Sequence, residues 1–274
     1  AATEAAFAKA HHVARLPLIN NRVVIAFMEP RSAIASYDAA SERLTLQAGC
    51  QAAHNLRAAL TSILDIEQDR LHVIVPDTGG GFGARNGVYP EFVLTLVTAR
   101  RLGRDVKWTA TRSEAFLTDF QARDHIFHGE LALDKEGHFL GLRVRADWRH
   151  GAYIASRSVW VMAHFLAQVM GGGYRMPTAY LNQRGVVTNT APMGAYRGIG
   201  RLEINYVLER LIDQAGHEMN IDPLTLRQRN LLNDGDLPWT MPGGAVVTTG
   251  EFTANLARAV ELADWHGAPA RAKA

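Results

Sequence analysis

Residues 71–102 read LHVIVPDTGGGFGARNGVYPEFVLTLVTARRL, and the pattern of this stretch changes twice. The apolar run Leu71–Pro76 predicts a strand, and four glycines then fall within Gly79–Gly83, the glycine loop. Pro90 stands at a favourable first helical position, and the apolar spacing after it predicts a helix that ends near Leu102. The stretch therefore predicts a strand, a glycine-rich turn and a helix in this order.

Strands and helices also mix without strict alternation on both sides of this stretch. Ala33–Tyr37 and Leu44–Gln47 predict two strands, and His128–Leu133 and Phe139–Trp148 predict a longer pair. Glu203–Met219 carries a continuous apolar stripe and predicts the clearest helix of the chain. Because the order is not a regular βαβ repeat, we expect the α+β class, with mixed sheets and packed helices.

Four further segments have shorter patterns. The Ala-rich segment Thr3–Leu16 predicts a helix that Pro17 ends. Val23–Phe27 and Arg184–Thr188 each predict a short strand. Residues 267–274 are low in complexity, which is typical of a tail or a linker.

The composition is that of an ordinary globular protein. Of 274 residues, 47% are hydrophobic and 20% charged, and the net charge of +2 gives no bias toward nucleic acid or membranes. The single cysteine, Cys50, excludes an internal disulfide and any cysteine-based zinc or iron–sulfur site. His125 and His128 lie on a strand-like segment without a third ligand nearby, so core or solvated histidines are expected.

The same composition bears on location. There is no run of about 18 apolar residues, so no membrane span is expected. The N-terminus shows no signal-peptide pattern, and both ends resemble cuts within a longer polypeptide. We therefore expect a cytoplasmic protein.

The glycine loop itself indicates a site for an anion. Glycines let the backbone approach a ligand closely, and exposed N–H groups can then donate to a phosphate or an oxo group. The spacing Gly79-x-Gly81-x-x-Ala84 also satisfies the loose dinucleotide fingerprint, which would indicate a nucleotide-binding oxidoreductase. However, Asp105 precedes the next predicted strand, whereas the fingerprint requires an acid at its end. A purely structural turn is the remaining interpretation.

Other segments extend the pattern across roughly residues 15–265 in one consistent order. They are Glu29–Arg31 with Tyr37–Asp38, Gln51 with His54, Pro76–Gly83 with Tyr89–Glu91, Lys107–Arg112, Arg123–His125, Thr188–Thr190, Ala195–Gly198, Glu209–Arg210 and Ile221–Pro223 with Arg229–Asn230. Together they resemble the molybdopterin-binding large subunit of the xanthine dehydrogenase, aldehyde oxidase and carbon monoxide dehydrogenase type of molybdenum hydroxylase, as an internal fragment or a split subunit. The resemblance implies a molybdopterin-binding domain over residues 1–266, the first half of a domain pair.

The resemblance also implies a set of cofactor-binding residues. In that family the molybdenum is held by the dithiolene of a pterin, so no direct side-chain ligand to the metal is expected. Gln51 would hydrogen-bond a molybdenum oxygen, backbone N–H groups of the glycine loop would cap the metal, and an Ala-aromatic-Arg segment would form the opposite wall. Carried over residue by residue, the set is Gln51, Gly80, Gly81, Phe82, Gly83, Ala195, Tyr196 and Arg197.

Several of these residues have a plainer interpretation. Gln51 could cap the start of its own helix, and Phe82 could fill the core. Arg197 could form a structural ion pair with Glu203. Glu91 is better explained as a first-turn acid of its helix than as a residue that faces the site.

Departures from the family pattern narrow the range of expected substrates. Gly198 stands where the carbon monoxide dehydrogenases carry a cysteine that holds copper, so carbon monoxide oxidation is disfavoured. Asn86 stands where purine-oxidising members carry a glutamate, and Ile199 at a position that is often aromatic and substrate-facing. The resemblance then implies a substrate pocket with Asn86 and Ile199, and hydroxylation of an aldehyde or N-heteroaromatic C–H with water-derived oxygen.

The resemblance implies partners as well. The family's catalytic base is a glutamate in a Gly-Glu-Pro-type motif, which this sequence lacks, so no catalytic residue is predicted here. We expect molybdenum–molybdopterin, including its cytosine dinucleotide form, with iron–sulfur clusters and FAD on partner chains. The other partners would be the remaining half of the molybdenum subunit and a small-molecule substrate. A non-catalytic assembly or structural subunit of such a complex is the alternative.

Overall fold

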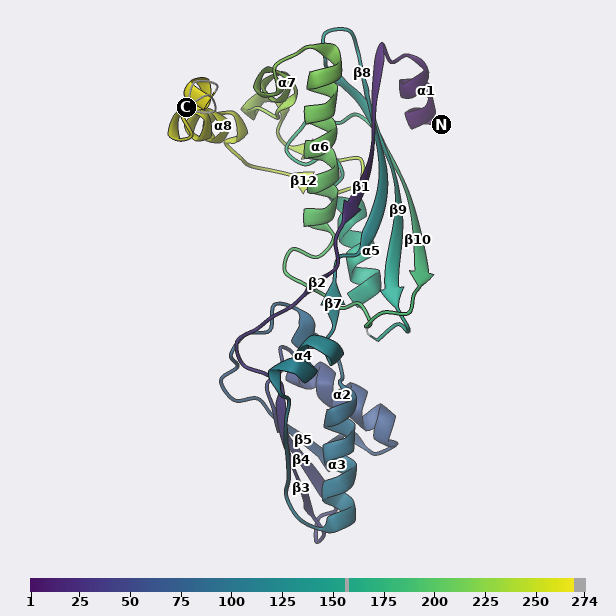
Figure 1. Ribbon diagram of the computed structural model, residues 1–274, viewed down its shortest axis with the longest axis vertical. Helices are drawn as coiled ribbons and strands as arrows, with labels where there is room; N and C mark the ends of the chain where they lie inside the picture. Colours follow the sequence, from purple (N-terminus) through teal and green to yellow (C-terminus); the bar gives the residue numbers. More distant parts are fainter. Residues whose placement is uncertain (156–157, 269–274) are drawn as a thin grey trace.

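Two lobes with separate sheets make up the structure (Figure 1), a computed structural model that describes residues 1–155 and 158–268. The larger lobe contains a four-stranded sheet in the order β1-β8-β9-β10. Its strands are β1 (His12–Asn20), β8 (His125–Leu133), β9 (Phe139–Gly151) and β10 (Ala179–Val187). β8 pairs antiparallel with both β1 and β9, whereas β10 runs parallel to β9.

Helices cover this sheet because their apolar stripes need a partner. α6 (Arg201–Met219) packs on β1 and β8, and α5 (Ser158–Gln168) packs beside it. The core between them includes Phe127 and Leu131 of β8 and Leu211 of α6. The short helix α1 (Ala2–Ala8) lies against β9.

The predicted helix Thr3–Leu16 is wrong beyond its first turns. α1 ends at Ala8, and β1 continues through Pro17, which is paired with His128 of β8. β1 is an edge strand, so the N–H that proline lacks costs no bond on the open side of the sheet. Pairing with β8 therefore overrides the helical propensity of the alanines.

The smaller lobe is built around the stretch 71–102. Its sheet has the order β5-β4-β3-β6, with β5 (Leu71–Ile74), β4 (Arg43–Ala48), β3 (Ser32–Asp38) and β6 (Val106–Thr109). α3 (Pro90–Leu102) packs on β3, and α2 (Ala53–Leu64) packs against β5. Leu46, Leu60 and Leu96 are fully buried between sheet and helices, as the apolar spacing predicts.

A short connection joins the lobes. β2 (Val23–Val24) pairs with β7 (Gln121–Ala122) between the two sheets, and α4 (Arg112–Thr118) lies at the end of the smaller lobe that faces the larger one (Figure 1). The predicted strand Val23–Phe27 is thus only two residues long. The buried side chains of Ile25 and Phe27 instead pack with Ala84, which follows the glycine loop.

The remaining elements are short and are distributed over both lobes. They are η1 (Gln68–Arg70), η2 (Ala84–Asn86), α7 (Pro223–Asn230), η3 (Asp234–Asp236), β11 (Trp239–Thr240), β12 (Val246–Val247), α8 (Phe252–Leu262) and η4 (Trp265–Gly267), of which η1 and η2 belong to the smaller lobe. The predicted tail 267–274 lies mostly outside the described residues. Within the described part of the chain, no helix is long and apolar enough to cross a membrane.

Candidate functional site

The glycine loop has a backbone shape that requires glycine. Gly83 has a φ of +106°, and a Cβ there would lie 2.6 Å from the carbonyl oxygen of Ala195. A Cβ on Gly81 would lie 2.7 Å from the side chain of Gln51. The glycines therefore allow two other segments of the chain to contact the loop directly.

Hydrogen bonds fix this contact from both sides. Oε1 of Gln51 accepts a hydrogen bond of 2.8 Å from the N–H of Gly83. The N–H of Arg197 donates to the carbonyl oxygen of Phe82 over 2.9 Å. Gln51, the glycine loop and the segment Met193–Gly200, the arginine loop, thus meet where the two lobes join.

Several donors at this meeting point have no partner. Among the residues that the structure describes, neither the backbone N–H groups of Gly81 and Phe82 nor the side-chain nitrogen Nε2 of Gln51 makes a hydrogen bond, and the guanidinium of Arg197 has no ion pair. The N–H of Gly83, in contrast, is already taken by Gln51. Converging free donors suit a group rich in anionic oxygen atoms, so the residues present fit the oxygens of a molybdenum centre.

A buried arginine supports the glycine loop from behind. The Arg85 guanidinium lies 3.0 Å from Oε2 of Glu29, and the same oxygen accepts a hydrogen bond of 2.6 Å from the N–H of Gly79. The Arg85 side chain is 1% exposed. One carboxylate therefore joins the first residue of the loop to a buried cation.

A second buried arginine supports the arginine loop. Arg123 donates to the carbonyl oxygens of Tyr196 and Arg197, over 3.3 and 2.8 Å, and lies 4.9 Å from the centre of the Tyr196 ring. Its guanidinium pairs at 2.7 Å with Glu203 in the first turn of α6. Arg123 itself has a left-handed backbone conformation, with a φ of +67°.

Three of the plainer interpretations are wrong. Gln51 does not cap α2, whose N-cap is Ala52 without a side-chain bond, because its side chain turns to Gly83. Glu203 pairs with Arg123 and not with Arg197. Phe82 is 45% exposed and so is not core filler.

Two further interpretations are confirmed. Glu91 is a first-turn acid of α3, and it pairs at 2.9 Å with the buried Arg31. His125 is fully buried against Trp148, with its pKa lowered to about 3 by burial and by the nearby charges of Arg123, His150 and Arg22. No group of three potential side-chain ligands that could hold a metal ion occurs among the described residues.

The nucleotide-binding interpretation does not fit this geometry. The Glu29 carboxylate already accepts the N–H of Gly79, and its negative charge would repel a phosphate there. The helix α3 does not follow the loop directly, since η2 and Gly87 lie between Gly83 and Pro90. The glycine loop therefore has the residue spacing of the dinucleotide fingerprint but not the strand–loop–helix structure that binds a nucleotide.

The two predicted substrate-pocket residues lie at the borders of the loops. Asn86 is exposed and ends η2, and Ile199 is half-buried with its N–H donated to Tyr196. Between Ile199 and the rest of the arginine loop, Gly198 has a φ of +89°, and a Cβ on it would overlap the side chain of Leu202. Any side chain at position 198 would need both strain and a displaced leucine.

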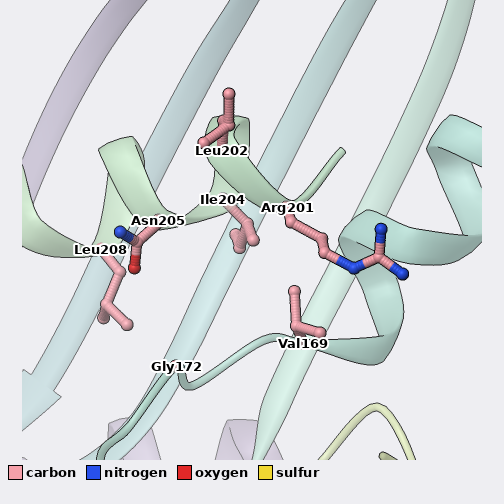
Figure 2. A pocket seen from close by; sticks show the side chains of 7 residues that line it. All are labelled: Val169, Gly172, Arg201, Leu202, Ile204, Asn205 and Leu208. Atoms are coloured by element: carbon pink, nitrogen blue, oxygen red, sulfur yellow. The ribbon is translucent and has the colours of Figure 1, made fainter. Parts of the chain in front are cut away.

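A separate cavity of about 280 Å³ lies along the start of α6 (Figure 2). It is lined by Val169, Gly172, Arg201, Leu202, Ile204, Asn205 and Leu208. Figure 2 shows Val169 pointing toward Ile204 across the hollow, while Arg201 extends to the side, where it stacks on Phe165 at 3.7 Å. Of the lining residues, Leu202 also covers Gly198, so the cavity is a neighbour of the arginine loop and does not contain the predicted cofactor-binding residues.

No role at the site was predicted for Glu29, Arg85 or Arg123, and Glu203 was considered only as a structural partner of Arg197. Glu29 and Arg123 lie in segments that carry the family resemblance, but nothing local links each to its partner. The structure explains why they matter, because a buried arginine such as Arg85 needs a carboxylate partner.

A family model for the molybdopterin cofactor-binding domain matches residues 2–231, which include all three meeting segments. The chain belongs to the molybdopterin cofactor-binding domain family. The predicted resemblance to the large subunit of molybdenum hydroxylases and the α+β class are both confirmed.

Individual relatives show the same similarity. The chain is 33% identical over 267 residues to the carbon monoxide dehydrogenase large chain of Hydrogenophaga pseudoflava, covering 97% of this chain and 33% of that protein. It is 34% identical over 262 residues to the nicotine 6-hydroxylase large subunit of Paenarthrobacter nicotinovorans, covering 95% and 32%. The crystal structure of quinoline 2-oxidoreductase from Pseudomonas putida 86 matches with a TM-score of 0.90 at 31% identity, covering 98% and 35%. The chain thus spans about a third of the length of these relatives.

Proposed function

We propose that this chain forms one wall of the molybdenum-cofactor site in a hydroxylase that adds a water-derived oxygen to a C–H bond of an aldehyde or an N-heteroaromatic. The observation that carries this proposal is the meeting of Gln51, the glycine loop and the arginine loop, held by the hydrogen bonds of Gly83 and Arg197. When bound, the molybdenum would accept the electron pair released as the C–H bond is oxidised.

The free donors define the proposed roles of the residues. The side-chain nitrogen Nε2 of Gln51 and the backbone N–H groups of Gly81 and Phe82 would donate to oxygens of the cofactor. The positive charge of Arg197 would balance the negative charge of these oxygens. Gly80 and Gly83 would keep the loop close to its neighbours, and Ala195 and Tyr196 would complete the opposite wall.

The acids that contact the two loops are not suited to act as the catalytic base. Glu203 pairs with Arg123 and its side chain is 1% exposed, so it cannot contact a substrate, and the carboxylate of Glu29 holds Arg85 and the N–H of Gly79. A general base must lie within hydrogen-bond reach of the proton it removes. We therefore propose that the base comes from the rest of the molybdenum subunit.

The arginine loop narrows the proposed substrates. A copper-holding cysteine at position 198 would overlap Leu202, which argues against carbon monoxide. Ile199 gives this side of the site an apolar surface, and the neutral Asn86 offers no carboxylate to a purine. By their names, the nicotine and quinoline relatives act on N-heteroaromatics, and an apolar aromatic ring or aldehyde suits the side chains present here.

The complete enzyme would need more than this chain. We propose that residues 1–266 act as one cofactor-binding domain, and that the pterin is bound as molybdopterin or its cytosine dinucleotide. The names of the relatives describe large subunits of larger complexes. Iron–sulfur and FAD-containing partner chains would then carry the electrons away.

An isotope experiment tests the proposed reaction. The chain is purified with its partner chains and supplied with quinoline or benzaldehyde in H₂¹⁸O, with an artificial electron acceptor. We expect one labelled oxygen in the hydroxylated product, and no turnover of xanthine or carbon monoxide. An unlabelled product, or oxidation of carbon monoxide alone, would contradict the proposal.

A further inference from the structure

The structure assigns a positioning role to the ion pair of Glu29 and Arg85, on the premise of the proposed function. This pair sets the shape of the glycine loop and the place of Gln51, and so the arrangement of donors offered to the cofactor. Neither side chain is among the residues that would contact the cofactor. Arg85 is buried behind the loop, and the carboxylate of Glu29 binds Arg85 and Gly79.

The pair holds the loop at its first residue. Oε2 of Glu29 accepts hydrogen bonds from the N–H of Gly79 over 2.6 Å and from Arg85 over 3.0 Å. A second guanidinium nitrogen of Arg85 donates to the carbonyl oxygen of Glu29 over 2.5 Å. The carbonyl oxygen of Gly79 in turn accepts the N–H of Glu29 over 3.3 Å. Glu29 therefore binds Gly79 twice, accepting its N–H with the side-chain carboxylate and donating its own N–H to the Gly79 carbonyl oxygen.

Arg85 also connects the glycine loop to Gln51. Its carbonyl oxygen accepts the N–H of Gln51 over 3.1 Å, while the Gln51 side chain binds Gly83. The guanidinium lies 4.5 Å from the centre of the Phe27 ring and against Gly49, where a Cβ would overlap it. The chain just before Gln51 can therefore pass this close to the Arg85 side chain because residue 49 is a glycine.

The guanidinium depends on one acid. Its Nε has no hydrogen-bond partner among the described residues, and Glu29 supplies the carboxylate that balances its charge. Removing that carboxylate would leave a buried cation unpaired, so Arg85 would have to move toward water. Its movement would release the Gly79 end of the loop and loosen the backbone contact to Gln51.

The test compares two acids that each pair with a buried arginine. Glu29→Gln removes the charge at almost constant shape, and Glu91→Gln is the control, because Glu91 also pairs with a buried arginine, Arg31, but forms no hydrogen bond with the glycine loop among the described residues. Hydrogen–deuterium exchange of the segment 76–89 is measured on the chain in its complex, together with molybdenum per chain. We expect Glu29→Gln to speed exchange at Gly79 and Gly83 about tenfold, the size of one lost charge-assisted hydrogen bond. Molybdenum content should fall in this variant alone.

Two results would overturn the positioning role. One is wild-type exchange in Glu29→Gln, and the other is equal acceleration in Glu91→Gln. If Glu29→Gln does not fold, Arg85→Lys is measured instead, since one lysine nitrogen cannot occupy the places of the two guanidinium nitrogens that bind Oε2 and the carbonyl oxygen of Glu29. The same acceleration of exchange would support the positioning role, and unchanged exchange would overturn it. A wild-type complex without molybdenum would instead refute the proposed function. The exchange data would still show whether the Glu29–Arg85 pair positions the glycine loop.

Discussion

Gly198 is a residue at which both the backbone conformation and the neighbouring side chain disfavour any other residue. Its φ of +89° is unfavourable for any other residue, and Leu202 occupies the space a Cβ would need. We expect Gly198→Ala to lower the free energy of unfolding by about 1–3 kcal/mol. Adding Leu202→Ala should recover part of this loss, because it removes the overlap but not the strain. Urea unfolding measures both, and a Gly198→Ala variant as stable as wild type would refute the steric argument.

His125 makes a prediction about pH. Burial holds its pKa at about 3, well below its usual value of 6.5, so folding favours the neutral ring. The stability that this provides is complete above pH 6.5 and is lost as the pH falls toward 3, because the unfolded chain then binds the proton. Between pH 7 and pH 5 the expected loss is about 2 kcal/mol.

The measurement compares urea unfolding at the two pH values in wild type and in His125→Phe. The phenylalanine variant should lack about 2 kcal/mol of the pH dependence, since its ring does not titrate. The ring nitrogens of His125 have no hydrogen-bond partner among the described residues, so no bond is lost in the variant. If the unfolding free energy depends on pH to the same extent in both proteins, His125 does not cause the loss of stability between pH 7 and pH 5.

Among the elements, the start of α6 is supported by a buried ion pair. The side chains of Arg123 and Glu203 are 10% and 1% exposed, and they connect the arginine loop to the first turn of this helix. Glu203→Ala leaves Arg123 buried without a partner, which should cost about 3–5 kcal/mol of unfolding free energy. The exposed pair of Arg258 and Glu261 in α8 provides a control, and Glu261→Ala should cost less than about 1 kcal/mol. Equal costs in the two variants would contradict the assigned role of the Arg123–Glu203 pair.

Elements with a strong local pattern could be predicted from the sequence, and those set by distant pairing could not. The apolar spacing of Glu203–Met219 indicated α6 almost to the residue, and Pro90 marked the start of α3. β1 was predicted as a helix because its alanines have helical propensity, and its pairing with β8, more than a hundred residues away, is invisible locally. β10 begins five residues before its predicted start for the same reason, since it is defined by its ladder with β9.

At the scale of the whole molecule, family resemblance indicated which loops meet, and physical pattern alone did not. The glycine loop by itself allowed an anion site, a nucleotide site or a turn. The supporting pairs could not be predicted, because Glu29 and Arg85 are 56 residues apart and Arg123 and Glu203 are 80 apart. The lobes themselves are joined through the two-residue strands β2 and β7, which are too short to produce a sequence signal.

Molybdenum content is the quantity that most directly reports whether the three meeting segments form a cofactor wall. The chain is purified with its partner chains, and molybdenum per chain is measured in wild type, Gln51→Ala and Arg197→Ala, with Arg184→Ala on the exposed edge of β10 as the control. The account predicts stoichiometric molybdenum in wild type and Arg184→Ala, and a several-fold loss in the other two variants. A molybdenum-free wild-type complex, or full molybdenum content in both Gln51→Ala and Arg197→Ala, would contradict it.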